Sequence, residues 1–348
     1  ITETVPPEKL FSNYLYFSSF ADTVVQNAQA ISNRMRTTLA LNKDNHVVEI
    51  ASNDGYLLQH YQEHGISVLG IEPAGNIAEA ARKRGIPTVN KFFNETVARQ
   101  IRAETGPADV IHANNVVAHV ADLHGVVAGI AALLKDDGIA VIENHYVKAL
   151  IDHTEFDSIY HEHLCYYSAT SFANLFKQHG LILVDVEHIP IHGGSLRVFF
   201  QRSDGPRSWE EAGGGARTID FLAAEQRWGA SEAGFYRDFG RKVARLKESL
   251  VSLLGELNSN GKSIAAYGAS AKSTTLLNYC GVGAETIRFV ADRSTVKQGL
   301  FTPGTHLPIV APEELLAQQP DYVILLSWNF VDEIMKQQEE YRRRGGRF

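Results

Sequence analysis

The sequence is poor in cysteine and has neither a long apolar run nor a block of like charge. Its two cysteines, Cys165 and Cys280, are too few and too far apart for a disulfide framework or a metal cluster. A membrane-spanning helix needs about 20 apolar residues, and the N-terminal residues lack the basic and apolar regions of a signal peptide. Lys and Arg number 33 against 40 Asp and Glu, a net charge of −7, whereas a nucleic-acid-binding protein should present a basic face. We therefore expect a cytoplasmic protein that binds neither nucleic acid nor membranes.

The rest of the composition is that of a globular protein. Hydrophobic residues make up 44% and charged residues 21% of the chain, and 348 residues correspond to about two domains. From residue 47 to about 200, short apolar runs alternate with amphipathic stretches, which is typical of a parallel sheet covered by helices. The predicted strands are 47–52, 67–73, 108–115 and 139–144, and the predicted helices are 56–65, 76–85, 124–138 and 168–180.

The second half of the chain continues the α/β pattern after a break. Strands at 181–190 and 195–202 are predicted to pair like a hairpin, and the glycine-rich, charged stretch 204–216 is predicted to be a loop. A long helical segment is predicted over 217–258, followed by a second, smaller Rossmann-like α/β unit. The predicted divisions are an N-terminal segment (1–40), a first α/β domain (41–204), a linker with a long helix (205–260) and a C-terminal α/β domain (261–348).

The turn after the first strand is a candidate binding loop. It runs from Glu49 to Gly55, and small-residue turns at the carboxyl ends of parallel strands bind ligands in this class of fold. The dinucleotide pattern G-x-G-x-x-G is absent, so a pyrophosphate is not the expected ligand. Glu72 ends the second strand and is placed to accept hydrogen bonds from the two hydroxyls of a ribose. The alternative is that these acidic residues only flank a helix N-terminus.

A second candidate site lies after the fourth predicted strand. Removing a proton from a carbon beside a ketone requires a base with a pKa near neutrality and donors for the enolate oxygen, roles that suit His and Tyr. The alternatives are a metal site built from His145, His153, His161 and His163 and a surface loop that happens to be rich in histidine. Seven polar side chains gather here: Asp157, Tyr160, His161, Glu162, His163, Tyr166 and Tyr167.

These motifs together resemble the class I S-adenosylmethionine-dependent methyltransferases. In particular they resemble the sugar C-methyltransferases that act at C-3′ of nucleotide-linked keto-deoxysugars. The usual first motif is E/D-x-G-x-G-x-G, from which Ala51 and Asn53 depart while Gly55 keeps the last glycine. Nearly the whole chain follows the family order, through YLYFSS (14–19), Phe92-Phe93, YHEH (160–163), HGGSLR (192–197), GASAK (268–272) and PGTHLPI (303–309).

The resemblance implies a fold, a cofactor and a reaction. The fold is a class I methyltransferase sheet over 41–204 followed by a smaller Rossmann-like domain. S-adenosylmethionine donates the methyl group and leaves as S-adenosylhomocysteine, and the acceptor is a ring carbon beside the ketone of a nucleoside-diphosphate 4-keto-deoxysugar. An O- or N-methyltransferase of the same fold, acting on a small molecule, is the alternative. The implied cofactor residues are Glu49, Ala51, Asn53, Asp54, Gly55, Glu72, Pro73, Phe92, Phe93, Asn114 and Asn115.

The resemblance also assigns substrate and catalytic residues. It places Tyr160, Glu162, His163 and His119 in the active site. One of the two histidines is expected to remove the proton, with His163 as the first candidate, and the other to adjust or relay it. Tyr160 is expected to donate to the enolate oxygen and Glu162 to bind the sugar. The C-terminal domain is expected to help hold the nucleoside-diphosphate sugar; the alternative is a degenerate Rossmann-like half that only packs and closes the pocket. Family members carry an N-terminal zinc module with Cys-x-x-Cys pairs, which this chain lacks, so we expect zinc only if such a module exists outside it. The expected substrate contacts are Tyr14, Tyr16, Ser18, Ser19, His192, Lys272 and Lys297.

Overall fold

The computed structural model describes residues 5–206, 209 and 215–348 and contains two compact units. Unit 1 comprises the chain up to Ala149 together with His161–Phe235, and unit 2 comprises Leu150–Tyr160 together with Tyr236–Phe348. The sequence places 150–160 inside the domain 41–204, whereas the contacts group this segment with the C-terminal part of the chain. Part of the predicted loop 204–216 lies outside the described residues.

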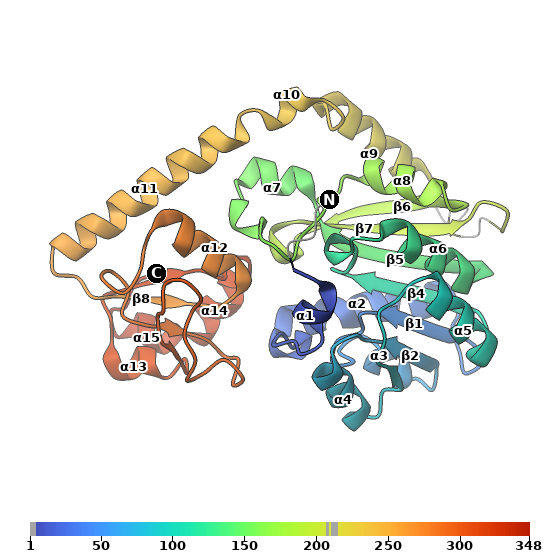
Figure 1. Cartoon of the computed structure of the whole chain (residues 1–348), viewed down its shortest axis with the longest axis horizontal. Coiled ribbons are helices and arrows are strands. Elements are labelled where there is room, and N and C mark those ends of the chain that lie inside the picture. Colours follow the sequence, from blue (N-terminus) through green and yellow to red (C-terminus); the bar gives the residue numbers. More distant parts are fainter. Residues whose placement is uncertain (1–4, 207–208, 210–214) are drawn as a thin grey trace. The chain divides into compact units, whose positions relative to one another are not determined.

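Unit 1 is built on a seven-stranded sheet in the order β3-β2-β1-β4-β5-β7-β6 (Figure 1). Strands β1 to β5 are parallel, and β7 lies antiparallel to both β5 and β6. This mixed sheet is the class I methyltransferase fold that the sequence predicts, and the hairpin-like pairing of the last two strands is confirmed. The strands are β1 (His46–Ile50), β2 (Ser67–Ile71), β3 (Thr88–Val89), β4 (Ala108–Asn114), β5 (Leu134–His145), β6 (Leu181–Ile189) and β7 (Ser195–Arg202).

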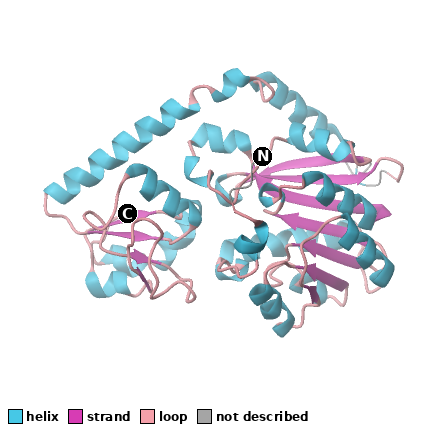
Figure 2. Ribbon diagram, in the orientation of Figure 1, coloured by secondary structure: helices cyan, strands magenta, loops and turns pink. Residues whose placement is uncertain are grey.

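Helices cover both faces of this sheet (Figure 2). The neighbours α5 and α6 pack against each other, as do α2 and α3. Buried side chains recur along α2 at Val24, Ala28, Ile31 and Met35, the spacing of one helix face. The helices are α1 (Pro7–Phe11), α2 (Asp22–Thr38), α3 (Gln59–Gln62), α4 (Gly75–Lys83), α5 (Glu95–Thr105), α6 (Leu123–Leu133), α7 (Val147–His153), α8 (Ala169–Lys177) and α9 (Gly215–Trp228), with the 3-10 turns η1 (Ser18–Phe20), η2 (Val117–His119) and η4 (Ile191–Gly193).

Several predicted helices are shorter than expected. The helix predicted at 124–138 ends at Leu133 because the next residues pair with β4 as the start of β5. The long helix predicted at 217–258 is interrupted. After α9 comes Gly229 at φ +80°, a conformation that ends a helix, and α10 (Ala233–Tyr236) and α11 (Phe239–Ser259) follow as separate elements.

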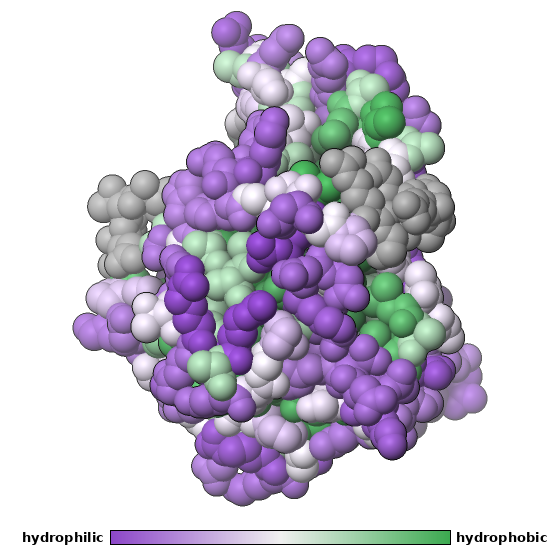
Figure 3. Space-filling view, turned by 90° about the vertical axis from the view of Figure 1, so that its right-hand side faces the viewer, coloured by the Kyte–Doolittle hydropathy of each residue, from purple (hydrophilic) through white to green (hydrophobic). Residues whose placement is uncertain are grey.

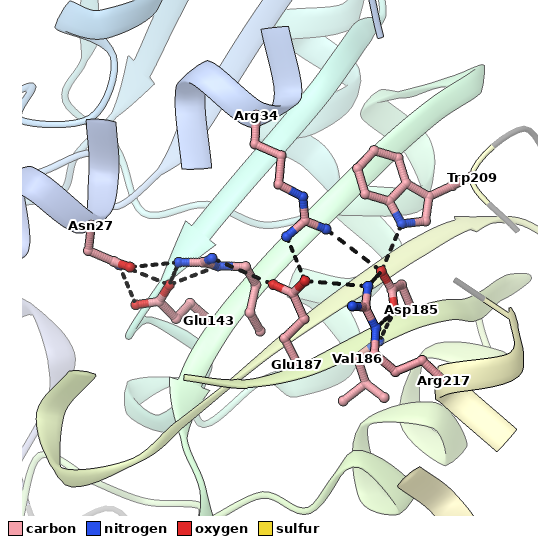
Figure 4. A network of polar contacts seen from close by, with 9 residues as sticks. Asn27, Arg34, Glu143, Asp185, Val186, Glu187, Trp209 and Arg217 are labelled. Carbon is pink, nitrogen blue, oxygen red and sulfur yellow. Dashed lines mark hydrogen bonds and ion pairs between the residues drawn. The ribbon is translucent and has the colours of Figure 1, made fainter. Parts of the chain in front are cut away.

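A network of buried and half-exposed charges connects the β5–β7–β6 edge of the sheet to α2 and α9 (Figure 4). Arg197 donates to Glu143 at 2.9 Å, and Arg34 donates to Glu187 at 2.6 Å. Three arginines face three carboxylates, so each buried charge has a partner of opposite sign. The members are Asn27, Arg34, Glu143, Asp185, Glu187, Arg197, Trp209 and Arg217.

Unit 2 has a parallel four-stranded sheet in the order β10-β9-β8-β11. The smaller Rossmann-like unit that the sequence predicts is present, and its strand β9 has only two residues. Its strands are β8 (Ile264–Tyr267), β9 (Val290–Ala291), β10 (Ile309–Val310) and β11 (Tyr322–Leu325). Its helices are α11, α12 (Ala271–Cys280), α13 (Glu314–Gln318), α14 (Val331–Gln337) and α15 (Glu339–Arg343), with the 3-10 turns η3 (Phe156–Ser158) and η6 (Trp328–Phe330).

The face drawn in Figure 3 is mostly hydrophilic, with separate small hydrophobic patches. In the described part of the chain, every helix is too short or too polar to cross a bilayer. The same residues contain no group of three or more His, Cys, Asp or Glu side chains arranged to hold a metal ion.

Candidate active site

The loop after β1 adopts the backbone of a glycine-rich cofactor loop. Ala51, Asn53 and Gly55 have φ angles of +51°, +49° and +82°. Left-handed angles favour glycine because a Cβ atom is strained there. Ala51 and Asn53 therefore occupy the two positions at which the family motif has glycine, with the backbone conformation that glycine would adopt.

Three carboxylates surround this loop. Glu49 on β1 is 1% exposed, and among the described residues neither of its oxygens has a hydrogen-bond partner. Burial, reinforced by the charges of Glu72 and Asp54, raises the pKa of Glu49 well above its ordinary value. Glu72 follows β2 and accepts from the backbone N–H groups of Asn53 (3.0 Å) and Ala74 (2.8 Å). Burial raises the pKa of Glu72 to about 7 despite these hydrogen bonds.

The N-terminal segment is tied to the same loop. The Asn53 side chain accepts from the Ser18 N–H at 2.9 Å and donates to the Tyr16 carbonyl at 3.1 Å. Asp54 is fully buried and accepts from the Ser19 hydroxyl at 2.5 Å and from Arg84 at 3.0 Å. Its second oxygen, Oδ1, is buried without a partner among the described residues. The expected substrate residues Tyr16, Ser18 and Ser19 thus contact the cofactor loop directly.

The other expected cofactor residues occupy neighbouring strand ends. Phe92 is 36% exposed, whereas Phe93 packs on Gly129 of α6, where a Cβ atom would lie only 2.8 Å from its ring. Asn114 ends β4 and approaches the Tyr56 hydroxyl at 3.4 Å. Asn115 (φ +55°) donates its N–H to the Glu143 carbonyl, and the Pro73 carbonyl accepts from Asn90.

The acid–base residues of unit 1 form a cluster. The rings of His119 and His163 are 4.8 Å apart and meet edge to face. Burial lowers the pKa of His119, opposed by the charge of Glu162. Tyr14 donates its hydroxyl to Glu162 at 3.0 Å, and Phe11 packs edge to face on His119 at 5.6 Å. Backbone bonds from Leu164 and Cys165 to the Ala118 carbonyl hold the loop against η2.

The remaining predicted residues lie elsewhere. His192 has φ +56° in the turn between β6 and β7, and Tyr160 is grouped with unit 2. In unit 2, Lys297 donates to the Ala269 carbonyl at 2.9 Å, in the loop after β8. Lys272 donates to the Asn329 side chain at 3.1 Å.

The residues at this loop fit S-adenosylmethionine. Buried carboxylate oxygens without partners, at Glu49 and Asp54, suit its cationic methionine end. Each oxygen of Glu72 accepts one backbone bond and keeps a second lone pair for a ribose hydroxyl. The half-exposed ring of Phe92 offers an apolar wall for adenine.

Comparison with known proteins decides the family. Residues 25–186 match the methyltransferase domain family, and residues 190–348 match the family described as the C-methyltransferase C-terminal domain. The C-methyltransferase NovU of Streptomyces niveus is 34% identical over 348 residues, which cover all of this chain and 82% of NovU. The chain belongs to the family of S-adenosylmethionine-dependent C-methyltransferases. Its reaction is therefore methyl transfer to carbon rather than the O- or N-transfer alternative.

The solved structures that resemble this C-methyltransferase have much lower sequence identity to it. Magnesium protoporphyrin IX methyltransferase from Synechocystis, solved with S-adenosylhomocysteine, is 12% identical, with a TM-score of 0.42 over 51% of this chain and 83% of that chain. The PH0226 protein from Pyrococcus horikoshii is 13% identical, with a TM-score of 0.44 over 56% of this chain and 97% of that chain.

Three residues near these sites were not predicted from the sequence. Arg84 pairs with Asp54, and Phe11 packs on His119, although neither belongs to a recognisable motif. Asp292 follows β9 of unit 2 in the way that Glu72 follows β2 of unit 1. The acidic residue after the strand in TIRFVADR (286–293) was the available signal for Asp292.

Proposed function

We propose that this enzyme methylates a ring carbon beside the ketone of a nucleoside-diphosphate 4-keto-deoxysugar. Bound S-adenosylmethionine supplies an electrophilic methyl group on a sulfonium centre. The protein must therefore remove a proton from the acceptor carbon, stabilise the resulting enolate and exclude water. One observation carries the proposal: the segment 11–19 contacts both the cofactor loop and the acid–base cluster, through Ser18, Ser19 and Tyr14.

His163 is the proposed base. It takes the proton from the carbon, and the two electrons of that C–H bond pass into the enolate and then to the incoming methyl group. The neighbouring imidazole of His119 stays neutral near pH 7 because burial lowers its pKa, so it can accept the proton in turn. Nδ1 of His119 is buried without a hydrogen-bond partner among the described residues, which makes His119 the second candidate for the base.

Two tyrosines and one carboxylate complete the proposed constellation. Tyr160 donates its hydroxyl to the enolate oxygen, an interaction that strengthens as negative charge develops. Glu162 binds a sugar hydroxyl, and the Tyr14 hydroxyl orients its carboxylate. Because O-methylation needs one base but no enolate donor, this set of residues suits a carbon acceptor.

Unit 2 is proposed to hold the nucleoside diphosphate. In both units, parallel strands follow the same order, and an acidic residue ends the second strand in sequence. Asp292 accepts from the N–H groups of Ala269 (2.6 Å) and Ser294 (2.7 Å), as Glu72 accepts from Asn53 and Ala74. This repeated geometry supports a second nucleoside site, with Lys297 and Lys272 as candidates for contacts to the diphosphate.

The test is turnover of nucleotide keto-sugars in deuterated water. We expect mass spectrometry to show transfer of one methyl group from S-adenosylmethionine. With S-adenosylhomocysteine in its place, the enzyme should exchange the acceptor C–H for deuterium. His163→Asn should lower both rates by roughly 10²- to 10⁴-fold and leave cofactor affinity unchanged. If His119→Asn loses deuterium exchange and His163→Asn keeps it, His119 is the base. If the wild type or either variant methylates the sugar without exchanging the C–H, the enolate mechanism is refuted.

A further inference from the structure

Four consecutive residues just before the acid–base loop are buried in unit 2. Glu155, Phe156, Asp157 and Ser158 are between 2% and 7% exposed, and the last three form η3. In sequence they lie between β5 and β6 of unit 1, yet η3 packs on α12 of unit 2. A buried stretch with two carboxylates requires specific partners.

The partners of Phe156 and Asp157 come from α12 and η6. Asp157 accepts a hydrogen bond from the Trp328 indole N–H at 2.7 Å, and the Phe156 ring lies 5.0 Å from the ring of Tyr279. Lys272 places its ammonium 4.8 Å from the centre of the Trp328 ring. Burial raises the pKa of Asp157, opposed by the Trp328 hydrogen bond and the charge of Lys272. The bond from the indole N–H is therefore a directional, partly buried hydrogen bond between η3 and η6.

Two backbone hydrogen bonds connect this contact to the next residues of the chain. Ser158 donates its N–H to the Glu155 carbonyl at 3.1 Å, and Ile159 donates to the Phe156 carbonyl at 2.9 Å. Tyr160 follows directly and belongs to the same unit. A hydroxyl that stabilises a transition state must be held within about 0.5 Å of its productive position.

We propose that Asp157 and Trp328 are positioning residues that hold Tyr160 in place for the reaction. The inference rests on the role proposed above for Tyr160. The indole N–H fixes the Asp157 carboxylate, the carboxylate fixes η3, and the turn at 158–159 transmits that position to Tyr160. Neither Asp157 nor Trp328 contacts the reacting atoms in this arrangement.

Trp328→Phe tests the proposal because it keeps a six-membered aromatic ring beside Lys272 and removes the indole N–H donor together with the pyrrole ring that carries it. We expect kcat for methyl transfer to fall about 10- to 100-fold, with an unchanged KM for the nucleotide sugar and unchanged affinity for S-adenosylmethionine. Asp157→Ala should show the same loss, and Asp157→Asn, which still accepts a hydrogen bond, should restore most of the rate. In a Tyr160→Phe background, Trp328→Phe should cause no further loss, since both act through one hydroxyl.

A second measurement does not depend on the substrate. Hydrogen–deuterium exchange of peptides that cover 155–161 should speed up in Trp328→Phe. The matched control is Tyr341→Phe, which removes another buried hydrogen bond of unit 2, from the Tyr341 hydroxyl to the Pro320 carbonyl at 2.7 Å. This control should change neither exchange at 155–161 nor kcat.

The outcomes separate this proposal from the proposed function. If the wild-type enzyme methylates no keto-sugar nucleotide, the proposed function fails, and the exchange measurement still decides whether Trp328 orders the segment before Tyr160. Unchanged exchange at 155–161 in Trp328→Phe overturns the positioning role. So does an unchanged kcat in an active enzyme, or a loss of rate that persists in the Tyr160→Phe background.

Discussion

Replacing Glu72 by Gln tests how the cofactor loop is held. Burial raises the pKa of Glu72 from 4.5 to about 7, a difference worth about 3 kcal/mol of folding free energy. Because the folded protein favours the protonated carboxyl, this stability is fully present below about pH 4.5 and is lost as the pH rises through about 7. Wild-type protein without cofactor should therefore lose about 3 kcal/mol from this group between acidic and mildly alkaline pH.

The Gln variant lacks that dependence. Gln cannot ionise. Its amide N–H₂ takes the place of one acceptor oxygen of Glu72, so the backbone N–H of either Asn53 or Ala74 loses its hydrogen bond, which lowers the stability by about 1 kcal/mol. At pH 5 we expect the variant to be slightly less stable than the wild type. Between pH 5 and pH 8 the difference in unfolding free energy should move by about 2.5 kcal/mol in favour of the variant.

Urea unfolding at pH 5, 6, 7 and 8, followed by tryptophan fluorescence, measures this difference. Glu63→Gln is the control, since the Glu63 side chain is 64% exposed in the same unit. Ribose hydroxyls donate to an ionised carboxylate, so wild-type affinity for S-adenosylmethionine should rise from pH 6 to pH 8, and calorimetry should find weaker, flatter binding in Glu72→Gln. A stability difference that stays constant with pH would refute the assignment of this titration to Glu72.

Three further substitutions test other parts of the structure. Ala51→Gly should raise the unfolding free energy by up to about 1 kcal/mol, because Ala51 has φ +51°; a destabilised variant in urea would count against strain at this position. Glu225→Ala should lower the free energy of unfolding by about 2–4 kcal/mol. The Glu225 carboxylate is fully buried and accepts from the N–H groups of Ala169 and Thr170 at the start of α8. An unchanged Tm in thermal unfolding would show that water replaces the carboxylate. Tyr14→Phe should lower kcat about tenfold without changing cofactor affinity, since its hydroxyl bonds to Glu162; steady-state kinetics showing an effect on KM alone would assign Tyr14 to binding.

The elements best predicted from sequence are those whose pattern is local. Apolar runs of strand length identified β1, β2 and β4, and the short IHGG connection between two apolar runs predicted the β6–β7 pair. The helix α2 was missed, although Val24, Ala28, Ile31 and Met35 recur at helical spacing. The glycines that interrupt 217–258 were visible in the sequence, but only the φ angle of Gly229 shows that the helix stops there.

In the candidate site, too, the motifs of neighbouring residues could be predicted from the sequence, and the contacts between distant residues could not. The order of the motifs indicated a cofactor loop at Glu49–Gly55 and an acid–base segment at 160–163, because such motifs depend on neighbouring residues. The sequence could not show that Tyr14 bonds to Glu162, 148 positions away, or that Ala51 and Asn53 take left-handed angles. It also could not show that residues 155–158 are buried with Trp328. Periodicity and spacing record the preferences of a chain over a few residues, whereas these contacts form only when folding brings distant segments together and buries their polar groups.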